Sequence, residues 1–170
     1  GEGVEREAVR FSGSLMNILM SYSRYTEGRF LYLSTQDVYG HYYAEDIGEI
    51  EPAAPEGIPG MVWSQAEEMC ENYRKSCNKD IIVLRLDHVY GIPESRRDVR
   101  DICSRMCLEA LEKKRNTVRA NHTFSLLYVT DAVEFINRLA MCKEHKSSIY
   151  NLSSMKEQTE VALADMICQA

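Results

Sequence analysis

The stretch FLYLSTQDVYG (residues 30–40) decides the fold because it changes character halfway along. Residues 30–33 are apolar, and residues 34–37 carry hydroxyl, amide and carboxylate groups. A second stretch, IIVLRLDHVYG (residues 81–91), has the same form and closes on the same Val-Tyr-Gly. Each pattern is typical of a buried strand that ends in a polar loop. We therefore predict strands over 29–34 and 81–86 that end at one place.

The segments around these strands predict a parallel sheet. Apolar residues recur at helical spacing over 8–22 and 62–77, and each of these helices directly precedes a strand. Residues 81–84 are apolar without interruption, which indicates a strand covered on both faces. Helices alternating with strands over short connections are typical of an α/β fold with a parallel sheet. Further elements are expected as a helix over 99–111, a strand near 126–128, a helix over 131–142, a strand over 149–152 and a helix over 159–169.

Composition excludes several classes of function. The 170 residues are enough for one domain with a core, and no apolar run is long enough to span a bilayer. The polar N-terminus predicts no secretion signal, so we expect a cytoplasmic protein. A net charge of −6 argues against nucleic acid as a partner. Six cysteines without a C-x-x-C pair favour reduced thiols over disulfides or a metal site.

The two strand ends predict one binding crevice. In open parallel sheets, ligands bind outside the carboxyl ends of the strands. Residues 34–37 follow the first strand, and Asp87 and His88 end the second. The alternative is that Thr35 and Asp37 only cap or turn the chain, as such residues often do. Because both strands end in polar residues, we favour a binding site over simple capping.

Four segments, FLYLSTQDVYG, VLRLDHVYG, LLYVTDAVEFI and IYNLSS, resemble in order and spacing the extended short-chain dehydrogenases/reductases. The likeness is to the NAD-dependent nucleotide-sugar epimerase/dehydratase family and covers nearly the whole chain. It implies an α/β fold with a partial Rossmann-like parallel sheet and a small C-terminal substrate-binding subdomain. We expect a single incomplete domain over 1–170, in which 1–95 form the latter half of the Rossmann-like region and 96–170 the substrate side.

The same resemblance says which parts of the family pattern are missing. Family members begin with a strand and a G-x-x-G-x-x-G loop that holds the dinucleotide, and none of the nine glycines here has that arrangement. The chain therefore resembles the C-terminal part of a longer protein, or the product of a truncated reading frame. The implied cofactor is NAD or NADP, with an incomplete site. The implied partners are a nucleotide-sugar substrate and either the missing N-terminal half or a second copy.

The family's catalytic pair is replaced. Its Tyr-x-x-x-Lys motif corresponds here to Met61 and Gln65, which keep the spacing of one helical turn. A tyrosine acts as a base near neutral pH when a cation lowers its pKa. Methionine has no proton to exchange, and Gln65 offers the cofactor only a hydrogen bond to a ribose hydroxyl. Tyr39, or Tyr42 and Tyr43 beside it, is left open as a substitute base.

The substrate side also departs from the family. Within Thr35-Gln36-Asp37, only Thr35 matches the Thr-Asp-Glu triplet of the dehydratases, and Asp37 is the shorter acid. The resemblance assigns catalysis to Thr35 and Asp37. It assigns substrate binding to four positions, which are Ser34, Gln36, His88 and Phe124.

Phe124 stands where several members carry an arginine for the nucleotide diphosphate, which leaves Arg119 and Arg85 as candidates to reach the site by another route. For Arg85, a structural role is expected. Two functions remain open: a divergent epimerase, dehydratase or reductase of surface-polysaccharide synthesis, and a non-catalytic module that binds nucleotide sugars.

Overall fold

The computed structural model describes residues 2–40, 47–92, 101–113, 117–119, 123–154 and 156–169. They form two compact units, each taken from two parts of the chain. Gly1–Arg85 with Ala140–Asn151 make the first unit, and Leu86–Leu139 with Leu152–Ala170 make the second. No helix among these described ranges is long and apolar enough to cross a membrane.

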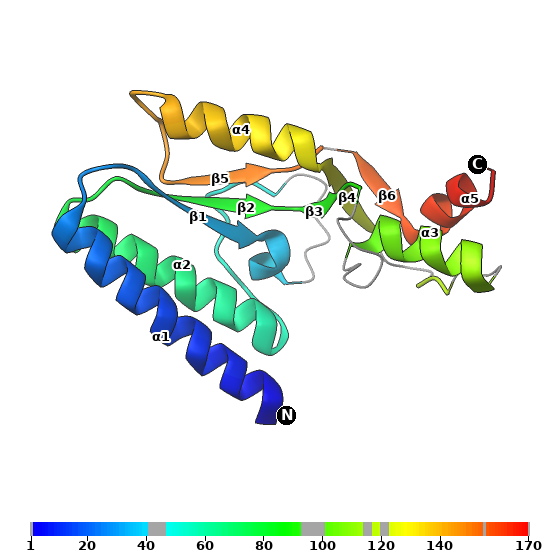
Figure 1. Ribbon diagram of the computed structural model, residues 1–170, viewed down its shortest axis with the longest axis horizontal. Helices are drawn as coiled ribbons and strands as arrows, with labels where there is room; N and C mark the ends of the chain where they lie inside the picture. The colour runs from blue at the N-terminus through cyan, green and yellow to red at the C-terminus, as the bar shows by residue number, and fades with distance from the viewer. Residues whose placement is uncertain are drawn as a thin grey trace. The chain divides into compact units, whose positions relative to one another are not determined.

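The first unit is a three-stranded sheet covered by two helices. Strands β1 (Phe30–Thr35), β2 (Ile81–Leu86) and β5 (Ile149–Leu152) lie in the order β1-β2-β5. All three arrows point the same way in Figure 1, which confirms the predicted parallel, adjacent strands. Helices α1 (Glu2–Tyr25) and α2 (Gly57–Cys77) lie side by side on one face of the sheet (Figure 1).

The apolar pattern explains how this unit packs. The two helices are joined through Phe11 and Trp63, whose ring centroids are 5.3 Å apart. The continuous apolar run of β2 is buried throughout, with Ile82 and Leu84 fully inaccessible, as expected for a strand covered on both faces. Helix α2 ends where Asn78 adopts the left-handed conformation and its N–H reaches the Arg74 carbonyl. The core comprises Leu15, Leu19, Tyr22, Tyr32, Ala66, Cys70, Ile81 and Val83.

A buried ion pair lies inside this unit. The Arg85 guanidinium of β2 donates to Glu67 of α2, with Nη2 2.7 Å and Nε 3.1 Å from Oε2. Both side chains are almost inaccessible, at 5% and 7%. Ser34 of β1 donates its hydroxyl to the same carboxylate. Since burying a charge is costly unless it is paired, this carboxylate holds α2 against both strands.

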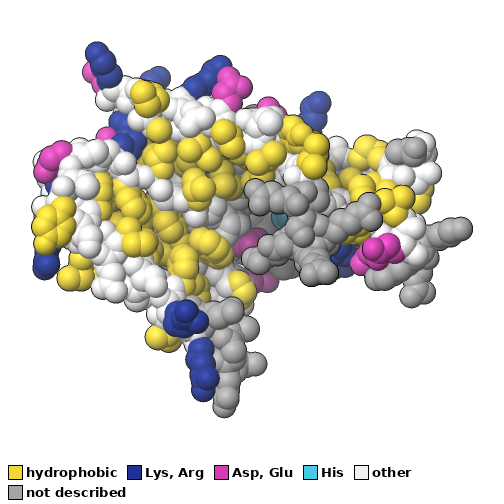
Figure 2. Space-filling view, viewed as in Figure 1, with side chains coloured by type: hydrophobic (Ala, Val, Ile, Leu, Met, Phe, Trp, Pro, Cys, Tyr) yellow, Lys and Arg dark blue, Asp and Glu magenta, His cyan; other side chains and the backbone are white. Residues whose placement is uncertain are grey.

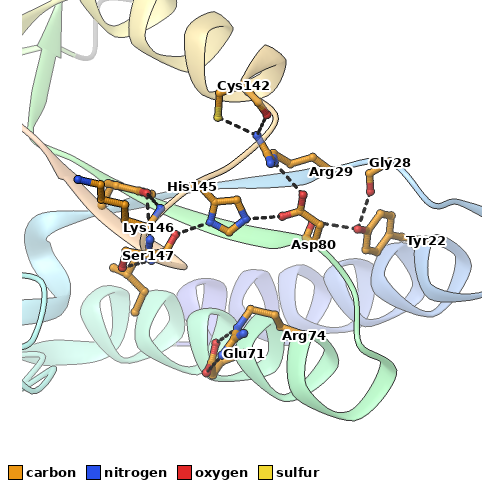
Figure 3. Close-up of polar contacts among 12 residues, drawn as sticks. Tyr22, Gly28, Arg29, Glu71, Arg74, Asp80, Cys142, His145, Lys146 and Ser147 are labelled. Carbon is orange, nitrogen blue, oxygen red and sulfur yellow. Dashed lines mark hydrogen bonds and ion pairs between the residues drawn. The ribbon is translucent and has the colours of Figure 1, made fainter.

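Figure 3 shows a second polar cluster, in the loops before the strands of the first unit. The Asp80 carboxylate accepts from Arg29 Nε at 2.9 Å and lies 2.9 Å from His145 Nε2. Arg29 Nη1 also donates to the Cys142 carbonyl at 2.8 Å, and the Tyr22 hydroxyl donates to the Asp80 carbonyl at 2.9 Å. These contacts join the loops that precede β1, β2 and β5.

The second unit has a smaller, mixed sheet. Strand β3 (His88–Tyr90) pairs in parallel with β4 (Thr123–Tyr128), and β4 pairs antiparallel with β6 (Glu157–Thr159). Helices α3 (Ile102–Lys113) and α5 (Glu160–Gln169) pack together, and α4 (Val129–Met141) follows β4 directly. The short strands β3 and β6 were not predicted. The core comprises Ile102, Met106, Phe124 and Leu163.

Gly40 supplies a test of the turn after β1. Its φ is 68°, and a Cβ there would lie 2.3 Å from the Ala54 carbonyl oxygen. We expect Gly40→Ala to lower the free energy of unfolding by roughly 2 kcal/mol or more. The control is Gly13→Ala in α1, where a Cβ has nothing within 4 Å and where alanine favours the helix by about 0.5–1 kcal/mol. Urea denaturation that gives both changes the same sign would contradict this account.

Candidate active site

The predicted residues after β1 split between structural and accessible positions. Ser34 is 4% exposed, and its hydroxyl is donated to Glu67, so it lies inside the unit. Thr35 begins the 3₁₀ helix η1 (Gln36–Tyr39), and its Oγ1 accepts from the Asp37 N–H at 3.2 Å. This is the capping role raised as the alternative. Because capping uses an oxygen lone pair, Thr35 still has a hydroxyl proton to donate. Gln36 is half-buried, and Asp37 is exposed.

Met61 and Gln65 lie on α2 near this strand end. Both side chains are exposed, and they are one helical turn apart. Gly60, just before Met61, approaches the chain so closely that a Cβ would lie 3.0 Å from the Asp37 carbonyl oxygen. The first turn of α2 therefore packs directly on the segment that carries Asp37. The structure brings this segment and the helix turn with Met61 together.

Tyr39, which the sequence analysis left open as a base, is engaged inside the first unit. It is 2% exposed, and its hydroxyl accepts from Arg85 Nη1 and donates to Asn151 Oδ1 at 2.9 Å. The Arg85 guanidinium also lies over its ring, 4.6 Å from the centroid. Through these hydrogen bonds the buried phenol connects η1 to strands β2 and β5. Tyr42 and Tyr43 lie outside the described residues.

Two thiols are also unsuited to nucleophilic chemistry. Burial raises the pKa of Cys70 to about 12 and that of Cys103 to about 11. Since the thiolate is the reactive form, neither cysteine is a nucleophile at neutral pH.

His88 and Phe124 lie together in the second unit. Their ring centroids are 5.3 Å apart, on the neighbouring strands β3 and β4. Phe124 is 5% exposed and belongs to the core of this unit. His88 Nδ1 lies 2.9 Å from Asp87 Oδ1, which also accepts the His88 backbone N–H at 2.8 Å. The carboxylate thus orients the imidazole.

A cavity of about 420 Å³ opens beside His88, within the second unit. Among the residues that the structure describes, those lining it are His88, Val89, Asp101, Ile102, Arg105 and Arg119. Asp101 Oδ1 accepts the Ser104 N–H at 2.8 Å and so caps the start of α3. The sequence raised Arg119 as a route to a phosphate but gave no reason to single out Arg105. Two guanidinium groups beside an imidazole suit an anionic ligand.

Asp87 gives this site a pH dependence. Burial alone would raise its pKa, but hydrogen bonds from the His88 ring and backbone N–H and from Ser125 outweigh that effect and hold the pKa below its usual value. A lowered pKa stabilises the folded state above about pH 4, and this contribution is lost as the pH falls through the folded-state pKa.

We expect Asp87→Asn to cost about 1–3 kcal/mol of unfolding free energy at pH 7, because the amide is a weaker acceptor. The difference from wild type should shrink as the pH falls from 5 to 2. Chemical denaturation at a series of pH values measures it. A difference that stays constant over this range would contradict the role given to Asp87.

The chain was compared with protein-family models and with solved structures, and both comparisons point to one family. The family described as "NAD dependent epimerase/dehydratase family" matches residues 10–153. A dTDP-glucose 4,6-dehydratase from Bacillus anthracis, solved in complex with NAD, superposes with a TM-score of 0.81 at 23% identity over 91% of this chain and 50% of its own. A UDP-glucuronic acid 4-epimerase from Bacillus cereus, in complex with UDP-glucuronic acid and NAD, gives 0.81 at 22% over 91% and 49%.

A UDP-glucose 4-epimerase from Thermotoga maritima, solved with UDP-glucose, gives a TM-score of 0.80 at 19% identity over 96% of this chain and 55% of its own. The chain thus spans about half the length of these solved structures. No curated protein sequence matches it. The family match over most of the chain, on a parallel α/β fold, means that this chain belongs to the NAD-dependent epimerase/dehydratase family.

Proposed function

We propose that this chain is the nucleotide-sugar side of an NAD-dependent epimerase/dehydratase whose proton-transfer step is impaired or carried by other residues. The observation that carries the proposal is the position of Met61 and Gln65. They lie exposed on α2, and the turn that holds Met61 packs on Asp37. At the place where the family needs a base and a cation, the chain presents a thioether and an amide.

The substrate we propose is a nucleotide sugar. Solved relatives are complexes with UDP-glucuronic acid and with UDP-glucose, which supports this class. In this chain, the cavity beside His88 offers guanidinium groups to an anion. We assign sugar contacts to Gln36 and His88, and acid-base work, where any remains, to Thr35 and Asp37. Phe124 and Ser34, being buried, support these residues from inside.

The cofactor we propose is NAD or NADP, bound incompletely by these residues. When bound, a nicotinamide accepts and returns the hydride of sugar oxidation. The fit in this chain is partial, because the Gln65 amide can bond a ribose hydroxyl but no G-x-x-G-x-x-G loop is present for the pyrophosphate. We therefore propose that the chain alone binds NAD too weakly for turnover.

The alternative is a cytoplasmic non-catalytic module that keeps the fold and binds nucleotide sugars or a second copy of itself. It is favoured by the same two side chains and by apolar residues on the outside of the helices. Figure 2 shows hydrophobic side chains gathered over α1 and α2. Exposed examples are Val9, Met16 and Ile18 of α1 and Ile58 and Met61 of α2.

The test compares wild type with the double variant Met61→Tyr and Gln65→Lys, which restores the family's base and cation. The whole protein is incubated with NAD and with UDP-glucose, UDP-glucuronic acid or dTDP-glucose. Products are separated by chromatography, and NADH is followed by absorbance. We expect negligible wild-type turnover and a gain of at least about 10²-fold in the variant. The matched control is Glu68→Tyr with Asn72→Lys, exposed positions two turns further along the same helix.

Each outcome decides between the functions. Wild-type turnover at ordinary enzyme rates would show that another residue transfers the proton, and it would contradict both an impaired proton-transfer step and the non-catalytic module. If turnover rises as much in the control as in the double variant, the effect does not depend on where the tyrosine and lysine lie on α2. No turnover by any form, with nucleotide sugar still bound, would favour the non-catalytic module.

A further inference from the structure

Glu160 is an unusual residue in the second unit, because it is an almost fully buried carboxylate. It is the first residue of α5 and is 1% exposed. Oε2 accepts the Arg119 backbone N–H at 2.7 Å. Oε1 accepts Nε of the Arg119 guanidinium at 2.8 Å and lies 2.7 Å from Nη2. One buried carboxylate therefore holds both the backbone and the side chain of a residue 41 positions away.

These contacts fix the direction of the guanidinium. Nε and Nη2 form its side edge, and this edge is engaged by Glu160. The end edge, formed by Nη1 and Nη2, is the fork with which arginine makes bidentate pairs with phosphate. The Arg119 side chain is 67% exposed and lines the cavity, although its anchor is buried. Glu160 thus acts on the cavity through Arg119.

Arg105 supplies a second guanidinium on the same cavity. It lies in the first turns of α3, and its side chain is 42% exposed. Its contact with Glu109 is long, at 3.8 Å, and therefore weak. Asp101 is the carboxylate among the described lining residues, and its Oδ1 accepts the Ser104 N–H. Two guanidinium groups on a cavity of about 420 Å³ match two linked phosphate groups.

Resting on the proposed function, we propose that this cavity binds the diphosphate of the nucleotide sugar through Arg105 and Arg119, and that Glu160 is the positioning residue that orients Arg119. The assignment moves the phosphate contact away from position 124, where the buried Phe124 leaves no cation.

Calorimetry with inorganic pyrophosphate, UDP and UDP-glucose on the whole protein tests this assignment. Arg119→Gln and Arg105→Gln should each weaken all three ligands roughly 10- to 100-fold, as loss of a charged hydrogen bond does. Arg119→Lys keeps the charge but loses the fork, so it should weaken them as well. Arg138→Gln is the matched control, since Arg138 is an exposed arginine paired with Glu134 in the preceding turn of α4. It should leave the affinities unchanged.

A double-variant comparison distinguishes a role of Glu160 in orienting Arg119 from a role in packing alone, because in the first case the two substitutions do not have additive effects on affinity. Glu160→Gln should weaken pyrophosphate in the wild-type background and have no further effect in Arg119→Gln. A purely structural role would lower affinity further in both backgrounds. Thermal melts identify variants that fail to fold, and Arg119→Lys then decides the assignment by itself.

The results also separate this assignment from the proposed function. If UDP-glucose binds with the same affinity to wild type and to the Arg105 and Arg119 variants, the assignment is overturned but the proposed function is not. Pyrophosphate binding that depends on both arginines, without binding of any nucleotide sugar, would support the anion site and contradict the function. Absence of binding by all three ligands would overturn the assignment.

Discussion

The first unit depends on the buried ion pair between Arg85 and Glu67. Two charges removed from water are tolerated because each satisfies the other, and the loss of either would leave an unpaired buried charge. The pair joins strand β2 to helix α2, Ser34 adds strand β1, and Tyr39 adds the turn that follows it. Through Asn151, which accepts from Tyr39, the network also reaches β5. One carboxylate and one guanidinium thereby determine where α2 lies on the strand ends.

This arrangement separates the fold from the chemistry. Glu67 faces inward from α2 and holds the helix, whereas Met61 and Gln65 face outward and contribute nothing to the core. The outward residues can therefore change without loss of the fold. Family membership, which follows the fold, therefore does not by itself determine which side chains these exposed positions carry. In the second unit, Glu160 supports Arg119 from inside in a comparable way.

The sequence predicted the regular elements well where a pattern was strong. The apolar run of β2 and the helical spacing of α2 identified both elements and their parallel sheet. Strands β3 and β6 were missed because strands of three residues arise from pairing with β4 and leave no periodic signal. The buried roles of Glu67 and Glu160 were also missed, since their partners lie 18 and 41 positions away. The proximity of Thr35 and His88 stays a prediction.

The central claim is that the Glu67–Arg85 pair holds the first unit together, and a double-mutant cycle measures it most directly. Glu67→Leu, Arg85→Leu and the double variant are compared with wild type by urea denaturation. Each single variant should lower the free energy of unfolding by about 3–5 kcal/mol, because it leaves a buried charge without its partner. The double variant should lose much less than the sum of the two, and its melting should stay cooperative. Additive losses, with a coupling energy below about 0.5 kcal/mol, would show that the pair is incidental and contradict the account.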